Sequence, residues 1–592
     1  MEQLKPDATG IYVAANQAAS AIEEAIEAEV PLIVAVAEHI PLHDMLKIHS
    51  ILDTQTKSRL VGANAPGIIS AVGKCRIGFQ PLSCFTPGRI GIVAKSGTLS
   101  YEAVASTTRA GLGQSLCIGM GGDILAGTNF VDALKVFEHD DETEGIIIIG
   151  EIGGEAELEA AAWIEEYKER SPNPKPIAAL VAGVHAPHDK VMGHAGAFAL
   201  LESNALAKIE AFKKVGVTMV NHPAKFGNAM KVLLENSGNS SNGANTGLAS
   251  QKRGMHTMRV RPTSRPSATD ITQKRTIYLQ KEDIMKLLDE KKLPRAYKLT
   301  SVGWRATTFC RATISIDRSN RCLCIILCKT KTTERKSFPF PYNSDHSAAQ
   351  WQNFVAFLKL EQEAETVKQI FSSLFEIFKE KEAFRFEVTI KRLELDDSGS
   401  DSDSRFIITN ATFGFDNAAF QSANRHSEIH SLPRADVQSA AEIEAEKHGI
   451  VYIKLAGDGN IGTLVNGAGL AMNTIDALAD AGGKAANFLD TGGKATAETV
   501  KRSFEAILGD ERVKVVFVNI FGGLTLGDMI AEGILLAFRE LEVGVPVVVR
   551  IRGTNEKEGQ RIIAESGLPL YAYDDFDEAA AKVVELANAS GA

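Results

Sequence analysis

The amino-acid sequence predicts an α/β protein that contains two doubly wound parallel sheets. Apolar runs at residues 146–149 and 547–549 are continuous rather than alternating, as strands buried on both faces of a sheet require. Each run is followed by a glycine-rich turn and an amphipathic helix, the alternation typical of parallel βαβ units. The pattern occurs twice along 592 residues, a length that predicts several domains rather than one core.

The two copies of this pattern are related by an internal repeat. Residues 88–100 (GRIGIVAKSGTLS) resemble residues 459–471 (GNIGTLVNGAGLA), about 370 positions further along the chain. Three more glycine turns recur at nearly the same spacing: Gly121 with Gly492, Gly153 with Gly522, and Gly183 with Gly553. Because ligands of doubly wound sheets bind beyond the carboxyl ends of the strands, these turns mark the expected site.

The expected elements divide the chain into five parts: residues 1–60, 61–236, 237–275, 276–440 and 441–592. The first part holds one strand–helix–strand unit, which is too little sheet to stand alone, at residues 10–14, 18–29 and 31–37. The second part holds the first copy of the repeat, whose strands include 146–150 and 178–182 and whose helices include 99–106 and 155–168.

The remaining parts are less uniform. Residues 237–275 are rich in Gly, Ser and Asn and have little to bury, so they are predicted to be a linker. The part that follows mixes short strands with one long helix, at residues 313–316, 323–327 and 361–379. The last part holds the second copy, with helices at 470–479 and Ala497–Leu508 and strands at 515–519 and 547–550.

Composition and charge exclude several classes of protein. A net charge of -10 offers no concentrated positive face for phosphates, so no nucleic-acid partner is expected. No apolar run approaches the ~20 residues that span a bilayer, so no membrane partner is expected. The seven cysteines fit a reducing compartment. The visible amino terminus has the character of neither a signal peptide nor a transit peptide.

His194 is the strongest candidate for a reactive side chain. It follows a predicted strand end, and the small residues Gly193, Ala195 and Gly196 leave its imidazole accessible to a large anion. The equivalent stretch of the second copy, residues 554–560, has no histidine, so the fold alone does not explain His194. Glu151 directly follows a strand at the same sheet edge, where its carboxylate could accept the proton of one imidazole nitrogen and leave the other nucleophilic.

Two glycine turns are predicted to open helices, one in each copy. Residues 96–98 (Ser-Gly-Thr) and 466–469 (Asn-Gly-Ala-Gly) precede amphipathic segments. Helix N-termini present free N–H groups and a partial positive charge, so the pair could hold one phosphate from both sides while it is bonded to His194. A metal site is the alternative use of the histidines His185, His188 and His194 with Asp189, but their spacing matches no compact metal motif.

The same residues carry a family resemblance. The stretches GHAGAF (193–198), GEIGGE (150–155), KSGTLSYEA (95–103) and GMGGDILAGTNF (119–130) resemble the alpha subunit of succinyl-CoA synthetase. Residues 459–476, 486–496 and 518–523 resemble the ligase domain of its beta subunit. ATP-citrate lyase belongs to the same superfamily but carries its beta-like part first. The chain therefore resembles a fusion of alpha-like and beta-like parts in the reverse order.

The resemblance implies a fold for each part of the chain. The two copies of the repeat are expected to be flavodoxin-like ligase domains. Residues 1–60 are expected to be a truncated, Rossmann-like CoA-binding part, and residues 276–440 a degenerate ATP-grasp part. It also implies a reaction of the tricarboxylic acid cycle: nucleotide phosphorylates a histidine, a carboxylate takes the phosphate, and CoA displaces it from the acyl phosphate.

By match to the family, His194 carries the phosphate and Glu151 orients the imidazole of His194. Glu387 matches the carboxylate that faces this histidine from the beta-like side. The acid substrate and phosphate are expected at Ser96, Gly97, Thr98, Tyr101, Asn466, Gly467, Gly469, Gly523, Leu524 and Thr525. Val36, Ala37 and Glu38 match part of the CoA contact surface.

Several positions depart from the family pattern. The two expected Mg²⁺ ligands are replaced by Thr389 and Asn410, and a hard cation has little to bind without carboxylates, so use of ATP or GTP in this part is doubtful. The glycine-rich turn of the CoA domain is absent, and Ala65 stands where a cysteine is expected. Leu526 replaces a family arginine beside the acid pocket, so the acid need not be succinate.

The expected function is that of a nucleotide-dependent acid–CoA ligase, impaired on its own, that uses a small carboxylic acid and CoA. It is expected to work with a partner ligase subunit or as a homodimer. The alternative is a non-catalytic paralogue or regulatory subunit that has lost nucleotide binding, and a third interpretation is a gene model that lacks segments. Family analogy favours the mitochondrion, with the cytoplasm as the alternative because no presequence is visible.

Overall fold

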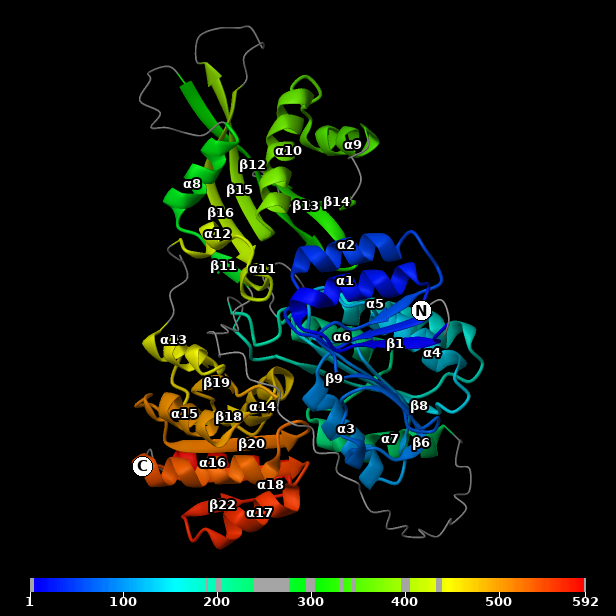
Figure 1. Ribbon diagram of the computed structural model, residues 1–592, viewed down its shortest axis with the longest axis vertical. Helices are drawn as coiled ribbons and strands as arrows, with labels where there is room; N and C mark the ends of the chain where they lie inside the picture. Colours follow the sequence, from blue (N-terminus) through cyan, green and yellow to red (C-terminus); the bar gives the residue numbers. More distant parts are fainter. Residues whose placement is uncertain are drawn as a thin grey trace.

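The structure is a computed structural model that describes residues 5–187, 190–197, 204–237, 276–293, 304–329, 335–342, 348–395, 405–432, 439–493 and 495–589. Strands of these residues form four sheets, two of them mainly parallel (Figure 1). Nearly all of the predicted linker at 237–275 lies outside the described residues, as do His188 and Asp189. No helix in the described part of the chain is long and apolar enough to cross a membrane.

The first ligase sheet has seven strands in the order β10-β9-β8-β6-β7-β4-β5. These are β4 (Gly67–Ser70), β5 (Cys75–Gly78), β6 (Pro87–Ala94), β7 (Gln114–Gly119), β8 (Gly145–Glu151), β9 (Ile177–Ala182) and β10 (Thr218–Met219). Strands β6 to β10 are parallel, whereas β4 and β5 form an antiparallel edge that the sequence did not predict. Residues 146–149 are completely buried, because helices cover both faces of the sheet. The helices are α3 (Gly97–Arg109), α4 (Phe130–His139), α5 (Ala156–Arg170), α6 (Ala205–Lys214) and α7 (Phe226–Asn236).

The second ligase sheet has six strands in the order β17-β19-β18-β20-β21-β22. They are β17 (Val451–Lys454), β18 (Ile461–Val465), β19 (Asn487–Asp490), β20 (Val515–Gly522), β21 (Val547–Gly553) and β22 (Leu570–Ala572), and only β17 is antiparallel to its neighbour. The helices are α13 (Ala440–Lys447), α14 (Ala468–Asp480), α15 (Ala497–Leu508), α16 (Gly527–Glu540), α17 (Glu556–Glu565) and α18 (Phe576–Ala589). Together the two ligase sheets confirm the predicted fold class.

The amino-terminal part is a three-stranded parallel sheet with two helices. Its elements are β1 (Ala8–Ile11), α1 (Ala15–Glu27), β2 (Leu32–Ala35), α2 (Leu42–Leu52) and β3 (Arg59–Val61). The strand predicted at 10–14 is wrong at both ends, because Ala14 caps α1 and the ladder with β2 stops at Ile11. The third strand, β3, crosses the boundary drawn after residue 60 and pairs with β2 through Ile33 and Leu60.

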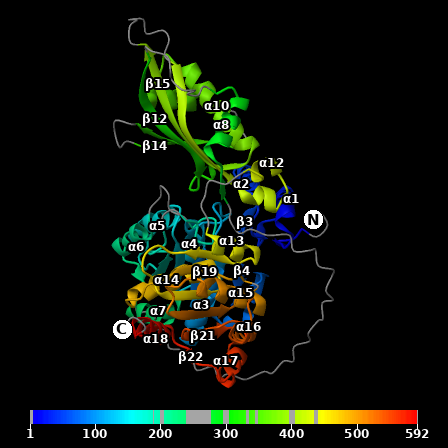
Figure 2. The ribbon, with the colours of Figure 1, turned by 90° about the vertical axis from the view of Figure 1, so that its left-hand side faces the viewer.

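The fourth sheet is antiparallel, in the order β11-β16-β15-β12-β13-β14. Its strands are β11 (Thr276–Tyr278), β12 (Trp304–Asp317), β13 (Cys322–Lys329), β14 (Arg335–Phe340), β15 (Ala383–Leu395) and β16 (Arg405–Asp416). Its helices are α8 (Lys281–Glu290), α9 (Ala348–Leu358), α10 (Ala364–Glu380), α11 (Asn417–Gln421) and α12 (Ser427–His430). Figure 2 shows α8 and α10 on the same side of this sheet.

The antiparallel part and the amino-terminal part share one hydrophobic core, although the amino-terminal part ends at Val61 and the antiparallel part begins at Thr276. The amide N–H of Leu42 donates to Asp416 at 2.6 Å, and the His43 ring lies 2.8 Å from the carbonyl oxygen of Ala383 through Nε2. Burial lowers the pKa of His43 to about 4, so this ring is a neutral packing residue. The antiparallel part is therefore fixed to the amino-terminal part through α2.

Candidate active site

His194 lies in the loop between β9 and α6, and its Nδ1 atom is 2.7 Å from Oε2 of Glu151, the last residue of β8. The loop around the ring is compact, because Gly196 donates to the carbonyl of Gly122 at 2.9 Å and Ala197 donates to that of His194 at 3.0 Å. A Cβ atom at Gly122 would lie 2.3 Å from Cγ of the ring, so only glycine leaves room for the imidazole here. The histidine and the carboxylate that the sequence singled out are thus in direct contact.

The surroundings of His194 favour its protonated form. Burial lowers its pKa, but the charge and hydrogen bond of Glu151, with further charge from Glu38 and Asp490, outweigh burial and raise the pKa to about 9. The side chain is 16% exposed, so the ring is enclosed but reachable. Val36, Ala37 and Glu38, the predicted CoA contacts, directly follow β2, and the charge of Glu38 contributes to the raised pKa of His194.

The two predicted helix N-termini meet each other. A Cβ atom at Gly467 would lie 2.3 Å from Oγ1 of Thr98, and one at Gly469 would lie 2.3 Å from Oγ of Ser96. Ser96 is the N-cap of α3 and Gly467 is the N-cap of α14, so the first turns of helices from the two copies are in van der Waals contact. Their partial positive charges are therefore concentrated in one place.

The histidine loop reaches the same place. A Cβ atom at Gly193 would lie 2.5 Å from the Cβ atom of Ala468, the first residue of α14. The residue beside His194 is thus in contact with a helix end from the other copy. The sequence predicted that both helix N-termini serve one phosphate on His194, and the structure brings the histidine loop into contact with the N-terminus of α14.

The side chain of Asn466, a predicted substrate contact, is bonded to backbone groups. Its side-chain amide donates to the carbonyl of Phe521 and accepts from the N–H of the same residue, both at 2.9 Å. The side chain therefore joins the start of α14 to the end of β20. Asp490, which sequence reasoning missed, also supports this turn by accepting from the N–H groups of Gly467 at 2.5 Å and Gly492 at 2.7 Å.

The turn after β20 lies against α3. A Cβ atom at Gly523 would lie 2.8 Å from the ring of Tyr101, and burial raises the pKa of that tyrosine above its usual value. Thr525 is buried, with no hydrogen-bond partner for its hydroxyl among the described residues, whereas Leu524 is exposed. Residues 523–525 thus close the side of the site that faces Tyr101.

Three charged side chains that sequence reasoning missed hold Glu151 in position. Glu157 on α5 accepts from Lys95 at 2.7 Å, from Lys208 at 2.5 Å and from the backbone N–H of Glu151 at 3.1 Å. Lys208 also donates to the carbonyl oxygens of Glu151 at 2.9 Å and Gly153 at 2.8 Å. Burial raises the pKa of Glu157, but the two lysines outweigh it and hold it at about 2. A signal was available: Lys208 occupies a buried stripe of α6.

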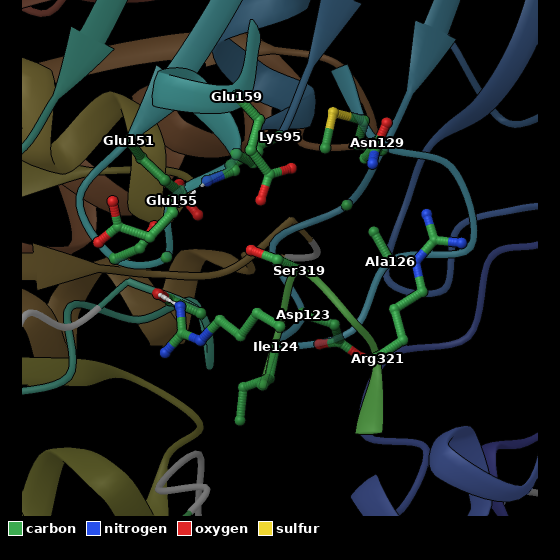
Figure 3. A pocket seen from close by; sticks show the side chains of 17 residues that line it. Lys95, Asp123, Ile124, Ala126, Asn129, Glu151, Glu155, Glu159, Ser319 and Arg321 are labelled. Atoms are coloured by element: carbon green, nitrogen blue, oxygen red, sulfur yellow. Dashed lines mark hydrogen bonds between the residues drawn. The ribbon is translucent and has the colours of Figure 1, made fainter. Parts of the chain in front are cut away.

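A pocket beside Glu151 is bounded by a hairpin from the antiparallel sheet. Figure 3 shows Ser319 and Arg321 on the opposite side of this pocket from Lys95 and Glu159. Arg318, on the same hairpin, donates to the carbonyl of Gly196 in the histidine loop at 2.9 Å. The antiparallel part therefore touches the candidate site through the turn between β12 and β13.

Glu387 is the predicted site residue that the structure does not bring to His194. It lies in β15, where its carboxylate accepts from Arg385 and shares a pocket with Thr389 and Asn410. Arg311 and Arg335 line the same pocket, so its charge repels a divalent cation. Within the described ranges, no group of three or more His, Cys, Asp or Glu side chains could hold a metal. These residues do not fit Mg²⁺, and therefore do not fit a metal-bound nucleotide.

The described residues do not support the alternative in which His185, His188 and His194 bind a metal. The ring of His185 lies 3.2 Å from Asp476 through Nδ1, and the same carboxylate accepts from the backbone N–H groups of Gly183, Val184 and His185 at 2.7, 3.1 and 2.8 Å. His188 and Asp189 lie outside the described residues. Asp476 belongs to α14, so this helix also anchors the start of the loop that carries His194.

Comparison with known proteins places the chain in a family. The model of the CoA-ligase family matches residues 93–214 and again residues 464–584, one match in each copy of the repeat. The alpha-2 subunit of mitochondrial, ADP-forming succinate–CoA ligase from Trichomonas vaginalis is 45% identical over 222 residues, which are 37% of this chain and 71% of that protein. The alpha subunit of the ADP-forming enzyme from Staphylococcus epidermidis is 42% identical over 221 residues, again 37% and 71%.

Among solved structures, ATP citrate lyase from Methanothrix soehngenii, in complex with citrate and coenzyme A, is similar at 23% identity and a TM-score of 0.36, over 50% of this chain and 46% of that one. The family assignment rests on the sequence matches. Both relatives are more than 40% identical to this chain, and the matched residues span more than two thirds of each relative. The chain therefore belongs to the succinyl-CoA synthetase superfamily of CoA ligases.

Proposed function

We propose that this chain is an acid–CoA ligase core that passes phosphate between His194, a small carboxylic acid and CoA. The observation that carries the proposal is the meeting of three pieces: the His194–Glu151 pair, the N-terminus of α3 and the N-terminus of α14. A histidine beside two helix N-termini is suited to a bound phosphate, because their N–H groups and partial charges stabilise the anion.

Each residue in the proposed site has a defined task. An ionised Glu151 can only accept hydrogen bonds, so Nδ1 of His194 carries a proton and Nε2 is the atom that takes the phosphate. Because the pKa of His194 is about 9, Nε2 is also protonated at neutral pH and must lose that proton before it attacks. Residues 96–98 and 467–469 hold the phosphate oxygens through backbone N–H groups.

In the direction that breaks down acyl-CoA, the proposed reaction needs no nucleotide. Inorganic phosphate attacks the thioester carbonyl of an acyl-CoA, which releases CoA thiol and gives an acyl phosphate. Nε2 of His194 then attacks phosphorus, which releases the carboxylate and leaves phosphohistidine. The loop at Val36, Ala37 and Glu38 is proposed to contact CoA. No step is assigned to ATP or GTP, because the pocket beside Thr389 and Asn410 does not fit Mg²⁺.

The test is to incubate the protein with radiolabelled phosphate and either succinyl-CoA or acetyl-CoA, without nucleotide. The expected result is an acid-labile, base-stable protein label that His194→Gln abolishes. His139→Gln, an exposed histidine at the end of α4, should keep the label and serves as the matched control. Label that persists in His194→Gln, or no label with either thioester, would refute the proposal.

A second function has one specific observation in its favour. The replaced metal positions Thr389 and Asn410 support a non-catalytic or regulatory subunit that binds a full-length ligase partner. Co-purification with such a subunit, without turnover by the chain alone, would favour this function. Robust ligase turnover by the purified chain would exclude it.

We also propose a mitochondrial location, with the cytoplasm as the alternative, on the similarity to the mitochondrial relative from Trichomonas vaginalis. Fractionation of cells that express the tagged chain tests this proposal. Label recovered with a mitochondrial matrix marker is expected, and label recovered only with cytosolic markers would contradict it.

A further inference from the structure

The turn between β12 and β13 is a short connection with a fixed shape. The residues that flank it, Asp317 and Cys322, pair directly across the two strands. The carboxylate of Asp317 accepts from the backbone N–H of Asn320 at 2.9 Å and from its side-chain amide at 2.8 Å. Arg321 closes the turn in a left-handed conformation, with a φ of 52°. The side chains of this turn therefore start from a defined backbone position.

Arg318, the first residue of this turn, contacts both segments that carry the candidate catalytic pair. Its Nη1 atom donates to the carbonyl oxygen of Gly196, two residues after His194, at 2.9 Å. A Cβ atom at Gly154 would lie 3.3 Å from Cδ and from Nη1 of Arg318. The arginine therefore packs closely on the glycine turn that follows Glu151.

Gly196 is held through both of its backbone polar groups. Its N–H donates to the carbonyl of Gly122 at 2.9 Å, and its carbonyl accepts from Arg318. A Cβ atom at Gly196 would lie 3.0 Å from the carbonyl oxygen of Gly122, so the histidine loop lies directly against the turn after β7. Ala197 donates to the carbonyl of His194 at 3.0 Å, so a shift of Gly196 also moves the histidine.

Two further contacts join the antiparallel part to this loop and its surroundings. Ala195, the residue after His194, is 6% exposed and belongs to the same hydrophobic core as Ile316 near the end of β12. Arg321, at the other end of the turn, forms an ion pair with Asp132 of α4 at 3.3 Å. The turn is therefore docked on the first ligase domain by apolar packing as well as by charge.

We propose that the antiparallel part positions the candidate catalytic histidine, with Arg318 as a positioning residue that holds the histidine loop against Glu151. The inference rests on the proposed function, because it concerns the reaction of the same histidine. Arg318 acts on the ring through the backbone at Gly196. This task requires neither a nucleotide nor a metal in the antiparallel part.

The first test measures the position of the ring and does not depend on activity. Arg318→Met removes a charge-assisted hydrogen bond, so the amides of Gly196 and Ala197 should exchange with solvent at least about tenfold faster. Nuclear magnetic resonance should give a lower pKa for His194 in this variant, because burial lowers that pKa and the contact with Glu151 raises it. Removal of a nearby positive charge would by itself raise the pKa, so the two explanations predict opposite signs.

The second test measures the reaction. Single-turnover labelling of His194, with radiolabelled phosphate and the acyl-CoA that labels the wild type, should slow at least about tenfold in Arg318→Met. Arg318→Lys should restore part of the rate, because lysine keeps the charge and a donor but not the planar guanidinium. Circular dichroism checks that each variant is folded.

Arg392→Met is the matched control. It removes an arginine and its ion pair with Glu363 from the same sheet, opposite Thr307 near the other end of β12. Exchange in the histidine loop, the pKa of His194 and the labelling rate should all match the wild type.

The two proposals fail in different ways. Wild-type protein that takes no label would contradict the proposed function, whereas exchange and the pKa of His194 would still decide whether Arg318 holds the ring. The role of Arg318 is overturned if folded Arg318→Met behaves as Arg392→Met does, or if the pKa of His194 rises.

Discussion

The two ligase sheets share a strand–turn–helix plan but differ in the loop that follows one equivalent strand. In the first, β9 ends at Ala182 and α6 begins at Ala205, and the intervening loop carries His194. In the second, β21 ends at Gly553 and α17 begins at Glu556. The long connection carries the proposed phosphate-accepting histidine, whereas the connection of two residues in the second copy leaves no room for an equivalent loop. In the proposed site, the shared fold sets the position at the sheet edge, and the loop provides the candidate catalytic side chain.

A second difference lies at the end of the central strand. When Gly153 is aligned with Gly522, Glu151 corresponds to Ile520, which is completely buried. The carboxylate that contacts His194 is thus an apolar core residue in the other copy. The second copy contributes α14, whose N-terminus abuts the histidine loop and whose Asp476 anchors the start of that loop. In the proposed site, the first copy carries His194 and Glu151, and the second copy helps to position the histidine loop.

The largest expected effect tests whether chemistry belongs to the first copy alone. His194→Gln should abolish phosphate incorporation completely, because no equivalent histidine exists in the second copy. The measurement is the amount of radiolabelled phosphate on the intact protein and on each of its proteolytic peptides. Radiolabel on peptides of the second copy would contradict the conclusion that only the first copy takes the phosphate.

The next effect tests the difference between Glu151 and Ile520. Glu151→Gln should slow phosphorylation of His194 by at least about 100-fold, because orientation of the ring is lost. The wild-type rate should rise with pH toward about 9, since the raised pKa keeps the ring protonated below that value. Without the charge of Glu151, burial dominates and lowers the pKa, so the rising limb should move to lower pH. Single-turnover rates from pH 6 to about 10 measure both effects.

Contacts between the two halves should differ strongly in their contribution to stability. Arg550 of β21 forms a completely buried ion pair with Glu102 of α3. Arg550→Met should lower the free energy of unfolding by about 3–5 kcal/mol, because it leaves a buried charge unpaired. Lys225→Met breaks an exposed pair with Asp577 across the same interface and should cost less than about 1 kcal/mol. Equal losses in urea unfolding would contradict this account.

The smallest effect tests how α14 holds the histidine loop. Asp476→Asn weakens three backbone hydrogen bonds but keeps one acceptor oxygen, so we expect a loss of roughly 1 kcal/mol. Hydrogen exchange at Gly183, Val184 and His185 should become faster while exchange within β9 stays slow. Unchanged exchange at these amides would show that the carboxylate does not hold the loop.

Periodicity predicted the parallel sheets because strands buried on both faces must be apolar throughout. The helix Ala497–Leu508 was predicted with its observed bounds. The antiparallel edge strands β4 and β5 were missed, because a short edge strand has no continuous apolar run. The pair His194 and Glu151 was predicted from strand ends, whereas the support from Lys208 was not, because no local pattern says which buried charges meet.

By itself the sequence determined the repeat, indicated the family and singled out His194 as the candidate for phosphate transfer, since these depend on residue type and order along the chain. Only the tertiary structure decided that Gly193 touches Ala468, that Ser96 faces Gly469 and that Arg318 reaches the carbonyl of Gly196. The reason is physical: residue patterns specify local conformation, but contacts between distant segments depend on how whole elements pack.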